Sequence, residues 1–276
     1  MLREARFEVL GPVRGWRGKE ELDLGSPQQR AVLVMLLLAR GRQVSVDRLM
    51  DGLWGEPAPR SAVGTVRTYI SRLRRALGTG AKGGPGERIE SIGDGYVLRL
   101  DSPVLDLNVF EDLHSEARAA WRRDEAKRAA CLLREALGLW RGAALAGIPG
   151  PYADSRRVPL AELRMTATEE QLAADIAVGD HTGAIADLRA LLAEHPFREG
   201  LGELLMLALY KSGRQAEALD VFGTLRRRLR AELGIDPGPS LQAMHQRVLR
   251  ADHRLMEAGH RLMEWADPHS ARLVCA

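Results

Sequence analysis

Residues 61–77 carry the clearest chemical signal in the chain, because most of their polar side chains are small or positively charged and none is acidic. The segment reads SAVGTVRTYISRLRRAL, and its apolar residues recur every three or four positions. That spacing predicts one α-helix with a single buried stripe. We expect the stripe to consist of Val63, Val66, Ile70, Leu73 and Leu77.

The opposite face of this predicted helix suits double-stranded DNA. At about 100° per residue it carries Gly64, Thr68, Ser71, Arg72 and Arg75, with Arg67 and Arg74 on one flank. Arginine donates two hydrogen bonds to guanine in the major groove, and a threonine methyl group contacts thymine. Flanking arginines bind phosphates, which supply affinity rather than sequence choice. An ordinary amphipathic helix with a solvated basic face is the alternative.

Two further helices are expected before this one. Ser26 followed by Pro27 predicts the start of a first helix, which continues through an apolar stripe to Ala39. Ser45 or Asp47 begins a second, short helix over residues 46–53. The DNA-directed helix would therefore be the third of a group of three.

Short strands are expected on either side of the three helices. Alternating apolar residues predict strands at 7–13 and 20–24, joined by a Gly-rich turn over 15–18. Residues 88–92 and 96–100 alternate around Gly93-Asp94-Gly95, which predicts a β-hairpin. A small sheet, three helices and a hairpin form the layout of a winged helix.

The second half of the chain predicts a helical-repeat domain. A set of small and large residues recurs with a period of 34, pairing Gly179, Ala184, Leu188 and Leu191 with Gly213, Ala218, Phe222 and Leu225. A similar spacing occurs earlier at Ala129, Leu133 and Ala136. Thirty-four residues is the tetratricopeptide length, and Pro196 falls where such a repeat ends its second helix. Accidental matches within an Ala/Leu-rich bundle are the alternative.

These patterns predict a mainly α protein with a small β component. We expect a DNA-binding domain at 1–102, a domain of tetratricopeptide-like repeats at 103–255, and a tail at 256–276 whose role is not assigned. Residues 1–100 contain 17 Lys/Arg and 11 Asp/Glu, whereas residues 101–276 contain 23 and 26. This asymmetry favours nucleic acid as a partner of the first domain, with chance variation of surface charge as the alternative.

Several classes of protein are not indicated. The N-terminus lacks the basic segment followed by an apolar segment that marks a secretion signal, and the apolar run 31–39 is too short for a membrane span. Cys131 and Cys275 lie far apart in the sequence, which does not suggest a disulfide framework. We therefore expect the protein in the cytoplasm. The Gly-rich stretch 78–84 lacks the Gly-Lys-Ser/Thr ending of a phosphate-binding loop. No catalytic set, metal site or cofactor motif is recognised, and Cys131 is predicted to be a core residue. We therefore expect no enzyme.

The predicted layout resembles the OmpR-type winged helix, with residues 65–77 similar to its recognition helix. Such a domain followed by a tetratricopeptide-like bacterial transcriptional activation domain resembles the Streptomyces antibiotic regulatory proteins. Further similar stretches are FEVLGP at 7–12, QQRAVL at 28–33, VDRL at 46–49, LWG at 53–55 and LRAELGIDPG at 229–238. The resemblance covers about residues 5–250.

The resemblance implies a transcriptional activator of secondary-metabolite (antibiotic) genes. Such a protein binds direct repeats near the promoter −35 element as side-by-side protomers, a homodimer on DNA. It recruits RNA polymerase holoenzyme through the sigma factor, the alpha subunit and neighbouring subunits. The segment between the second and third helices would contact polymerase; it consists of Gly55, Glu56, Pro57, Ala58, Pro59 and Arg60.

By position, the resemblance implies that Arg72 and Thr68 read bases with help from Arg67, while Arg74 holds the DNA backbone. The hairpin tip departs from the pattern, because Asp94 would repel phosphate where relatives carry arginine; Arg88 at the hairpin base is the better candidate. The predicted DNA-binding residues are Thr65, Arg67, Thr68, Ser71, Arg72, Arg74, Arg75 and Arg88. A repeat-based adaptor, whose basic first domain binds acidic proteins, is the competing function.

Overall fold

The computed structural model describes residues 5–78, 88–100 and 104–257. Most of the Gly-rich stretch 78–84, Cys275 and nearly all of the predicted tail lie outside the described residues. The chain forms two compact units. Unit 1 contains residues 5–112 and 136–164, and unit 2 contains residues 113–135 and 165–257. The domain boundaries predicted from the sequence stay a prediction, because three helices, at 106–122, 126–137 and 151–178, contain residues of both units.

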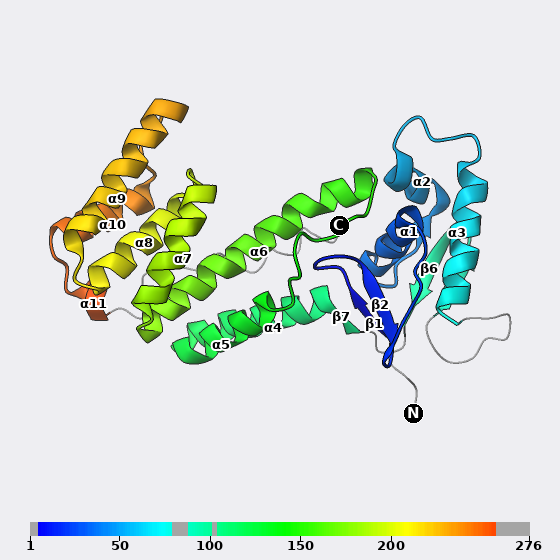
Figure 1. Ribbon diagram of the computed structural model, residues 1–276, viewed down its shortest axis with the longest axis horizontal. Helices are drawn as coiled ribbons and strands as arrows, with labels where there is room; N and C mark the ends of the chain where they lie inside the picture. Colours follow the sequence, from blue (N-terminus) through cyan, green and yellow to red (C-terminus); the bar gives the residue numbers. More distant parts are fainter. Residues whose placement is uncertain (1–4, 79–87, 101–103, 258–276) are drawn as a thin grey trace. The chain divides into compact units, whose positions relative to one another are not determined.

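Unit 1 begins with a small sheet in the order β3-β2-β1-β7 (Figure 1). Its strands are β1 (Ala5–Glu8), β2 (Arg14–Arg17), β3 (Glu20–Glu21) and β7 (Val104–Leu105). The predicted strand 7–13 is wrong beyond Glu8, because the chain leaves the sheet there and the backbone N–H groups of Val9 and Leu10 donate to the carboxylate of Asp106. The predicted turn at 15–18 is also misplaced, since Gly15 lies within β2 opposite Phe7.

The three predicted helices are confirmed as α1 (Pro27–Leu38), α2 (Val46–Trp54) and α3 (Ala62–Ala76). The hydroxyl of Ser26 accepts from the N–H of Gln29, and that of Ser45 accepts from the N–H of Arg48. Each serine therefore satisfies a backbone donor that the first helical turn leaves without a partner.

The predicted hairpin is confirmed as β5 (Arg88–Ile92) and β6 (Gly95–Arg99), and β4 (Val44–Ser45) pairs with β6 to extend it. Gly95 permits this third strand, because a Cβ atom there would lie 2.3 Å from the carbonyl oxygen of Val44. The hairpin is thus fastened to the connection between α1 and α2.

Most of the remaining described chain is helical. Its helices are α4 (Asp106–Arg122), α5 (Ala126–Leu137), α6 (Pro151–Val178), α7 (His181–Glu194), α8 (Glu199–Lys211), α9 (Gln215–Arg228), the π-helix η1 (Leu229–Leu233), α10 (Pro239–Leu249) and α11 (Arg254–Glu257). No helix among the described residues is long and apolar enough to cross a membrane.

The 34-residue period matches the packing of unit 2, where α7, α8 and α9 follow one another in contact (Figure 1). Ala184 of α7 and Ala218 of α9 are both buried, as are Leu188 and Phe222 one turn later. Gly179 and Gly213 hold positive φ angles of 99° and 75° between helices. The small alanines let neighbouring helices approach, and the glycines supply the turn conformation that L-residues avoid.

A buried ionic cluster lies inside unit 2. The carboxylate of Glu170 on α6 accepts from Arg118 Nε at 2.8 Å and lies 2.5 Å from His114 Nε2, both on α4. All three side chains are less than 10% exposed. Paired charges of this kind tolerate burial because each satisfies the other.

Two predictions about burial are wrong. Cys131 is an exposed free thiol, because it lies on the outer side of α5 rather than in its buried stripe of Ala129, Ala130 and Leu133. Val63 is 40% exposed, and Ala62 takes the buried position in its place.

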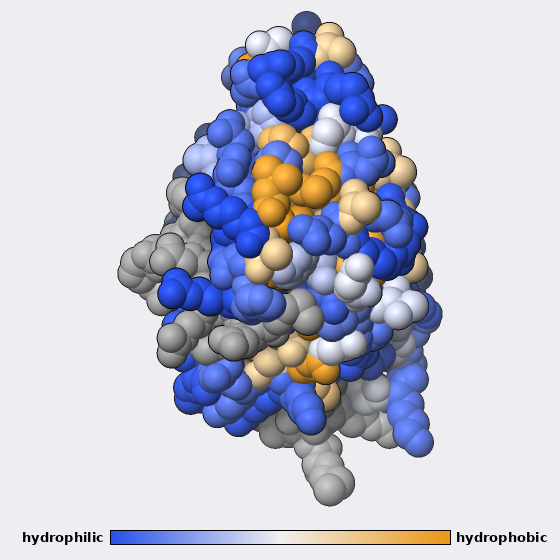
Figure 2. Space-filling view, turned by 90° about the vertical axis from the view of Figure 1, so that its left-hand side faces the viewer, coloured by the Kyte–Doolittle hydropathy of each residue, from blue (hydrophilic) through white to orange (hydrophobic). Residues whose placement is uncertain are grey.

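Apolar side chains, framed by hydrophilic ones, also reach the surface of the helical part (Figure 2). The large exposed apolar side chains of unit 2 include Leu233, Ile235 and Leu249.

Candidate nucleic-acid interface

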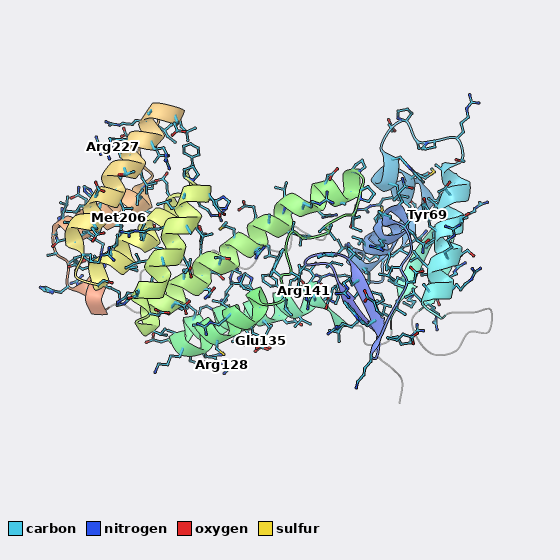
Figure 3. All side chains as sticks on the ribbon, in the orientation of Figure 1. Tyr69, Arg128, Glu135, Arg141, Met206 and Arg227 are labelled. Carbon is cyan, nitrogen blue, oxygen red and sulfur yellow. The ribbon has the colours of Figure 1, made fainter. Side chains whose placement is uncertain are left out.

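Helix α3 is held in unit 1 along one side only. Ala62, Val66, Ile70, Leu73 and Leu77 are at most 3% exposed, and α3 packs against α1 and α2. Tyr69 adds a polar tie, because its hydroxyl donates to Gln28 Oε1 of α1 at 2.7 Å (Figure 3). At the far end, Arg17 of β2 donates to the carbonyl oxygen of Leu77.

The outer face of α3 is exposed and basic. The exposed residues of this face are Gly64, Arg67, Thr68, Ser71, Arg72 and Arg75. Among the described residues, no hydrogen bond or ion pair forms with the guanidinium groups of Arg67, Arg72 or Arg75. The face therefore keeps three positive charges without a neutralising carboxylate, as phosphate and base-edge binding require.

The threonine hydroxyls of this face are already used as donors. Thr65 Oγ1 donates to the carbonyl oxygen of Ser61 at 3.1 Å, and Thr68 Oγ1 donates to that of Gly64 at 2.9 Å. A hydroxyl bonded back to its own helix offers a ligand only its acceptor lone pairs and its methyl group. Thr68 is therefore suited to contact a thymine methyl or to accept from a base amino group.

Gly64 leaves the first turns of α3 open to close approach. A Cβ atom built on it would meet no other atom within 4 Å, so nothing in the fold requires a glycine there. Glycine inside a helix costs about 1 kcal/mol relative to alanine. Because Gly64 lies on an exposed basic face and packing does not require it, its lack of a side chain is suited to close contact with another molecule.

Arg74 points toward the hairpin instead of outward. Its Nε donates to the carbonyl oxygen of Ile89 at 2.8 Å, and its NH2 group donates to Ser91 Oγ at 2.9 Å. Its guanidinium carbon also lies 5.8 Å from the ring centroid of Tyr96. The structure thus gives Arg74 a role in joining α3 to the hairpin, and its predicted contact with the DNA backbone stays a prediction.

The hairpin carries paired charges. Arg88 Nε donates to Glu90 Oε1 at 2.6 Å, and Arg99 Nε donates to Glu90 Oε2 at 3.3 Å. The hydrogen bond from Arg88 lowers the pKa of Glu90, with a smaller contribution from Arg99. The positive charge of Arg88, the predicted hairpin contact, is therefore shared with a neighbouring carboxylate.

Asp94 at the hairpin tip has a structural partner that the sequence did not reveal. Gln43 Nε2 donates to Asp94 Oδ1 at 2.9 Å and to the carbonyl oxygen of Ile92 at 2.9 Å. The backbone carbonyl of Asp94 accepts from the N–H of Val46 at 3.0 Å. The acidic residue at the tip thus fastens the hairpin to the start of α2.

The segment between α2 and α3 lies at the surface beside this face. Gly55 ends α2 with a φ of 68°, and Glu56, Pro57, Pro59 and Arg60 are exposed. Gly55 and Ala58 are half-buried. The structure therefore presents a short surface segment that is continuous with the beginning of α3.

Comparison with known proteins identifies two domain families in the chain. Residues 19–98 match the family described as transcriptional regulatory protein, C terminal, and residues 105–249 match the bacterial transcriptional activator domain. These matches confirm the predicted order of a winged helix followed by a helical activation domain.

Curated relatives include the regulatory protein AfsR of Streptomyces griseus, 50% identical over 250 residues, which are 91% of this chain and 25% of AfsR. The chain therefore spans about a quarter of AfsR. It is also 36% identical over 252 residues to the regulatory protein DnrI of Streptomyces peucetius, covering 90% of this chain and 93% of DnrI.

A solved structure of Mycobacterium tuberculosis EmbR, in complex with a low-affinity phosphopeptide, has a similar fold. It aligns with a TM-score of 0.83 at 32% identity and covers 93% of this chain and 69% of that one. Together with the two domain families and the relatives named regulatory proteins, this similarity shows that the chain belongs to the Streptomyces antibiotic regulatory protein family of transcriptional regulators.

Proposed function

We propose that this protein activates transcription by binding direct repeats near promoter −35 elements and recruiting RNA polymerase holoenzyme. The observation that carries the proposal is the exposed face of α3, where Arg67, Arg72 and Arg75 lie with Gly64, Thr68 and Ser71 and, within the described part of the chain, pair with no carboxylate. A major groove about 12 Å wide accepts a helix with such small and basic side chains.

The residues proposed to contact DNA are divided by the chemistry that each offers. Arg72 and Thr68 read base edges with help from Arg67. Thr65 and Ser71 lie beside them on α3. Arg75 contacts phosphate, as does Arg88 on the hairpin. Arg74 is proposed as a backbone contact in addition to its bonds to the hairpin.

The polymerase contact is proposed for residues 55–60, of which Glu56, Pro57, Pro59 and Arg60 are exposed and which lead directly into the DNA-directed helix. Side-by-side protomers on direct repeats would present two such segments to the sigma factor, the alpha subunit and neighbouring polymerase subunits. The regulated genes are proposed to direct secondary-metabolite (antibiotic) biosynthesis, and the compartment is proposed to be the cytoplasm.

A gel-shift titration of the purified protein against fragments of its own upstream region tests the proposal. It should include a random-sequence competitor and two salt concentrations. We expect tight, salt-dependent binding to a fragment with direct repeats, which the competitor does not abolish. Binding that the competitor removes would leave only a basic surface and would favour the protein-interaction adaptor.

A further inference from the structure

The two flanks of α3 offer different side chains to DNA. At about 100° per residue, Arg67 and Arg74 lie on one flank. Thr65 and Tyr69 lie on the other flank, which has no basic side chain of α3. A helix in the major groove lies between the phosphates of the two strands, which border the groove on either side. A donor to the phosphates on the Tyr69 side would therefore come from another element.

Helix α1 supplies a side chain at this flank. The hydroxyl of Tyr69 donates to Gln28 Oε1 at 2.7 Å, and Gln28 lies in the first turn of α1 (Figure 3). Thr65 and Arg72 are the neighbours of Tyr69 on the surface of α3, because residues three or four positions apart lie side by side on a helix. The amide of Gln28 is thus held at the edge of the face that carries the proposed DNA contacts.

The hydrogen bond from Tyr69 fixes the orientation of this amide. A glutamine amide has one oxygen, which accepts hydrogen bonds, and one nitrogen, which donates two. Since the oxygen of Gln28 accepts from Tyr69, its nitrogen is turned to another side. Among the residues that the structure describes, the nitrogen donates to no acceptor, and the side chain is only half-buried. Two N–H donors beside α3 are therefore available to a ligand.

We propose that Gln28 donates to a DNA phosphate on the Tyr69 side of α3, and that Tyr69 positions its amide for this contact. The inference rests on the proposed DNA-binding function. Glutamine is one of the side chains that bind phosphate oxygens, and such a contact sets the register of a protein on the duplex without reading its sequence. An amide is neutral and displaces no counterion. The contact therefore adds affinity for every sequence and leaves the salt dependence of binding unchanged.

Gel-shift titrations of the full chain against its upstream fragment and against a random-sequence duplex of equal length test this contact. We expect Gln28→Ala to weaken binding to both duplexes about tenfold at an unchanged salt slope, because a phosphate oxygen loses a hydrogen-bond donor. Gln28→Glu should weaken both further, since its carboxylate still accepts from Tyr69 but repels phosphate. Gln246→Glu is the matched control, because it adds the same charge to an exposed side chain of α10 in unit 2. It should bind as the parent chain does.

Tyr69→Phe tests the positioning role, because it removes only the hydroxyl that holds the amide of Gln28. It should weaken binding to both duplexes severalfold. If Tyr69 acts through Gln28, the double variant Tyr69→Phe, Gln28→Ala should bind no more weakly than Gln28→Ala alone. Additive losses in the double variant would overturn the positioning role.

Unchanged binding by Gln28→Ala and Gln28→Glu would overturn the phosphate contact. A loss confined to the upstream fragment would also overturn it, because a residue that only holds α3 in place affects sequence choice. Gln28→Glu keeps an acceptor for Tyr69 and so remains the test if Gln28→Ala does not give the parent circular dichroism spectrum. A parent chain that binds neither duplex would remove the proposed function, and this contact with it, whereas parent binding with unaffected variants removes the contact alone.

Discussion

Arg67, Arg72 and Arg75 differ from Arg74 in where their guanidinium groups lie. The first three are exposed on the outer face of α3, whereas Arg74 donates to Ile89 and Ser91 of the hairpin. All four are arginines in one basic segment, and helical periodicity places Arg74 only on the flank of the outer face. The distinction depends on the β5–β6 hairpin, whose Ile89 lies 15 residues after Arg74 in the chain.

Arg72→Ala should weaken binding to the cognate site by about 1–3 kcal/mol and relax the choice of base at one position, because arginine reads guanine through two hydrogen bonds. Gel-shift titrations against the operator and its single-base variants measure both effects. Lys19→Ala, which removes an exposed positive charge far along the chain from α3, serves as the control. Unchanged operator affinity for Arg72→Ala would mean that the recognition face is placed wrongly.

Gly64→Ala should affect folding and DNA binding in opposite directions. A methyl group at this position meets no atom within 4 Å, so helix propensity should raise the free energy of unfolding by up to about 1 kcal/mol. The same methyl group would stand between α3 and the DNA, so operator affinity should fall. Urea unfolding and gel shifts on one preparation measure the two effects. A variant that is stabilised and keeps full operator affinity would show that DNA does not approach Gly64 closely.

Arg74→Ala should lower the free energy of unfolding by about 1–3 kcal/mol, because the part-buried carbonyl oxygen of Ile89 loses a charged hydrogen-bond donor. Urea unfolding measures this loss, with the exposed Arg75→Ala as the control. Parent stability in Arg74→Ala would contradict the joining role. The salt dependence of DNA binding tests the backbone contact separately, since losing one phosphate contact lowers the slope by about one unit.

At the scale of elements, the predictable features were those encoded by neighbouring residues. Helices α1 and α2 begin at Ser26 and Ser45, whose hydroxyls cap them, and the β5–β6 hairpin turns at Gly93. The end of β1 was not predictable in this way. Residues 9–12 were expected to continue the strand, but their partners are Asp106 and residues 141–146, far along the chain.

Asp106 holds residues 9 and 10 in place, and its ionisation should change the free energy of unfolding with pH. Its carboxylate accepts from the N–H groups of Val9 and Leu10, while Arg141 pairs with nearby Glu8 (Figure 3). Burial raises the pKa of Asp106 above 3.8, although hydrogen bonds from Leu10, Val9 and Leu107 oppose the shift. The folded state therefore binds this proton more tightly than the unfolded state does.

Because the pKa of Asp106 is raised in the folded state, its contribution to the free energy of unfolding is greatest below pH 3.8 and declines as the pH rises through the raised pKa. Asp106→Asn cannot titrate, so its stability relative to the parent should improve over that interval. Urea unfolding of both proteins at a series of acidic pH values measures the difference. A difference that does not change with pH would contradict the raised pKa.

At the scale of the whole chain, the order of the two domain families was predictable because each has its own periodicity. The 34-residue period of unit 2 placed Ala184 and Ala218 at equivalent buried positions before any contact was known. The composition of the compact units was not predictable, since residues 136–164 join unit 1 through long-range contacts such as Arg141 to Glu8.

Whether DNA binding and transcriptional activation depend on different residues can be tested on the segment between α2 and α3. Glu56, Pro57, Pro59 and Arg60 are exposed, and none of them belongs to the stripe that anchors α3. If this segment contacts polymerase, replacing Pro59 and Arg60 by alanine should reduce transcription in a purified system severalfold while operator affinity stays at the parent value.

Arg72→Ala is the converse control, because it should reduce transcription only as far as it reduces DNA occupancy. Raising the protein concentration separates the two cases. Saturating the operator should restore transcription by Arg72→Ala but not by the segment variant, and equal restoration of both would remove residues 55–60 as the polymerase contact.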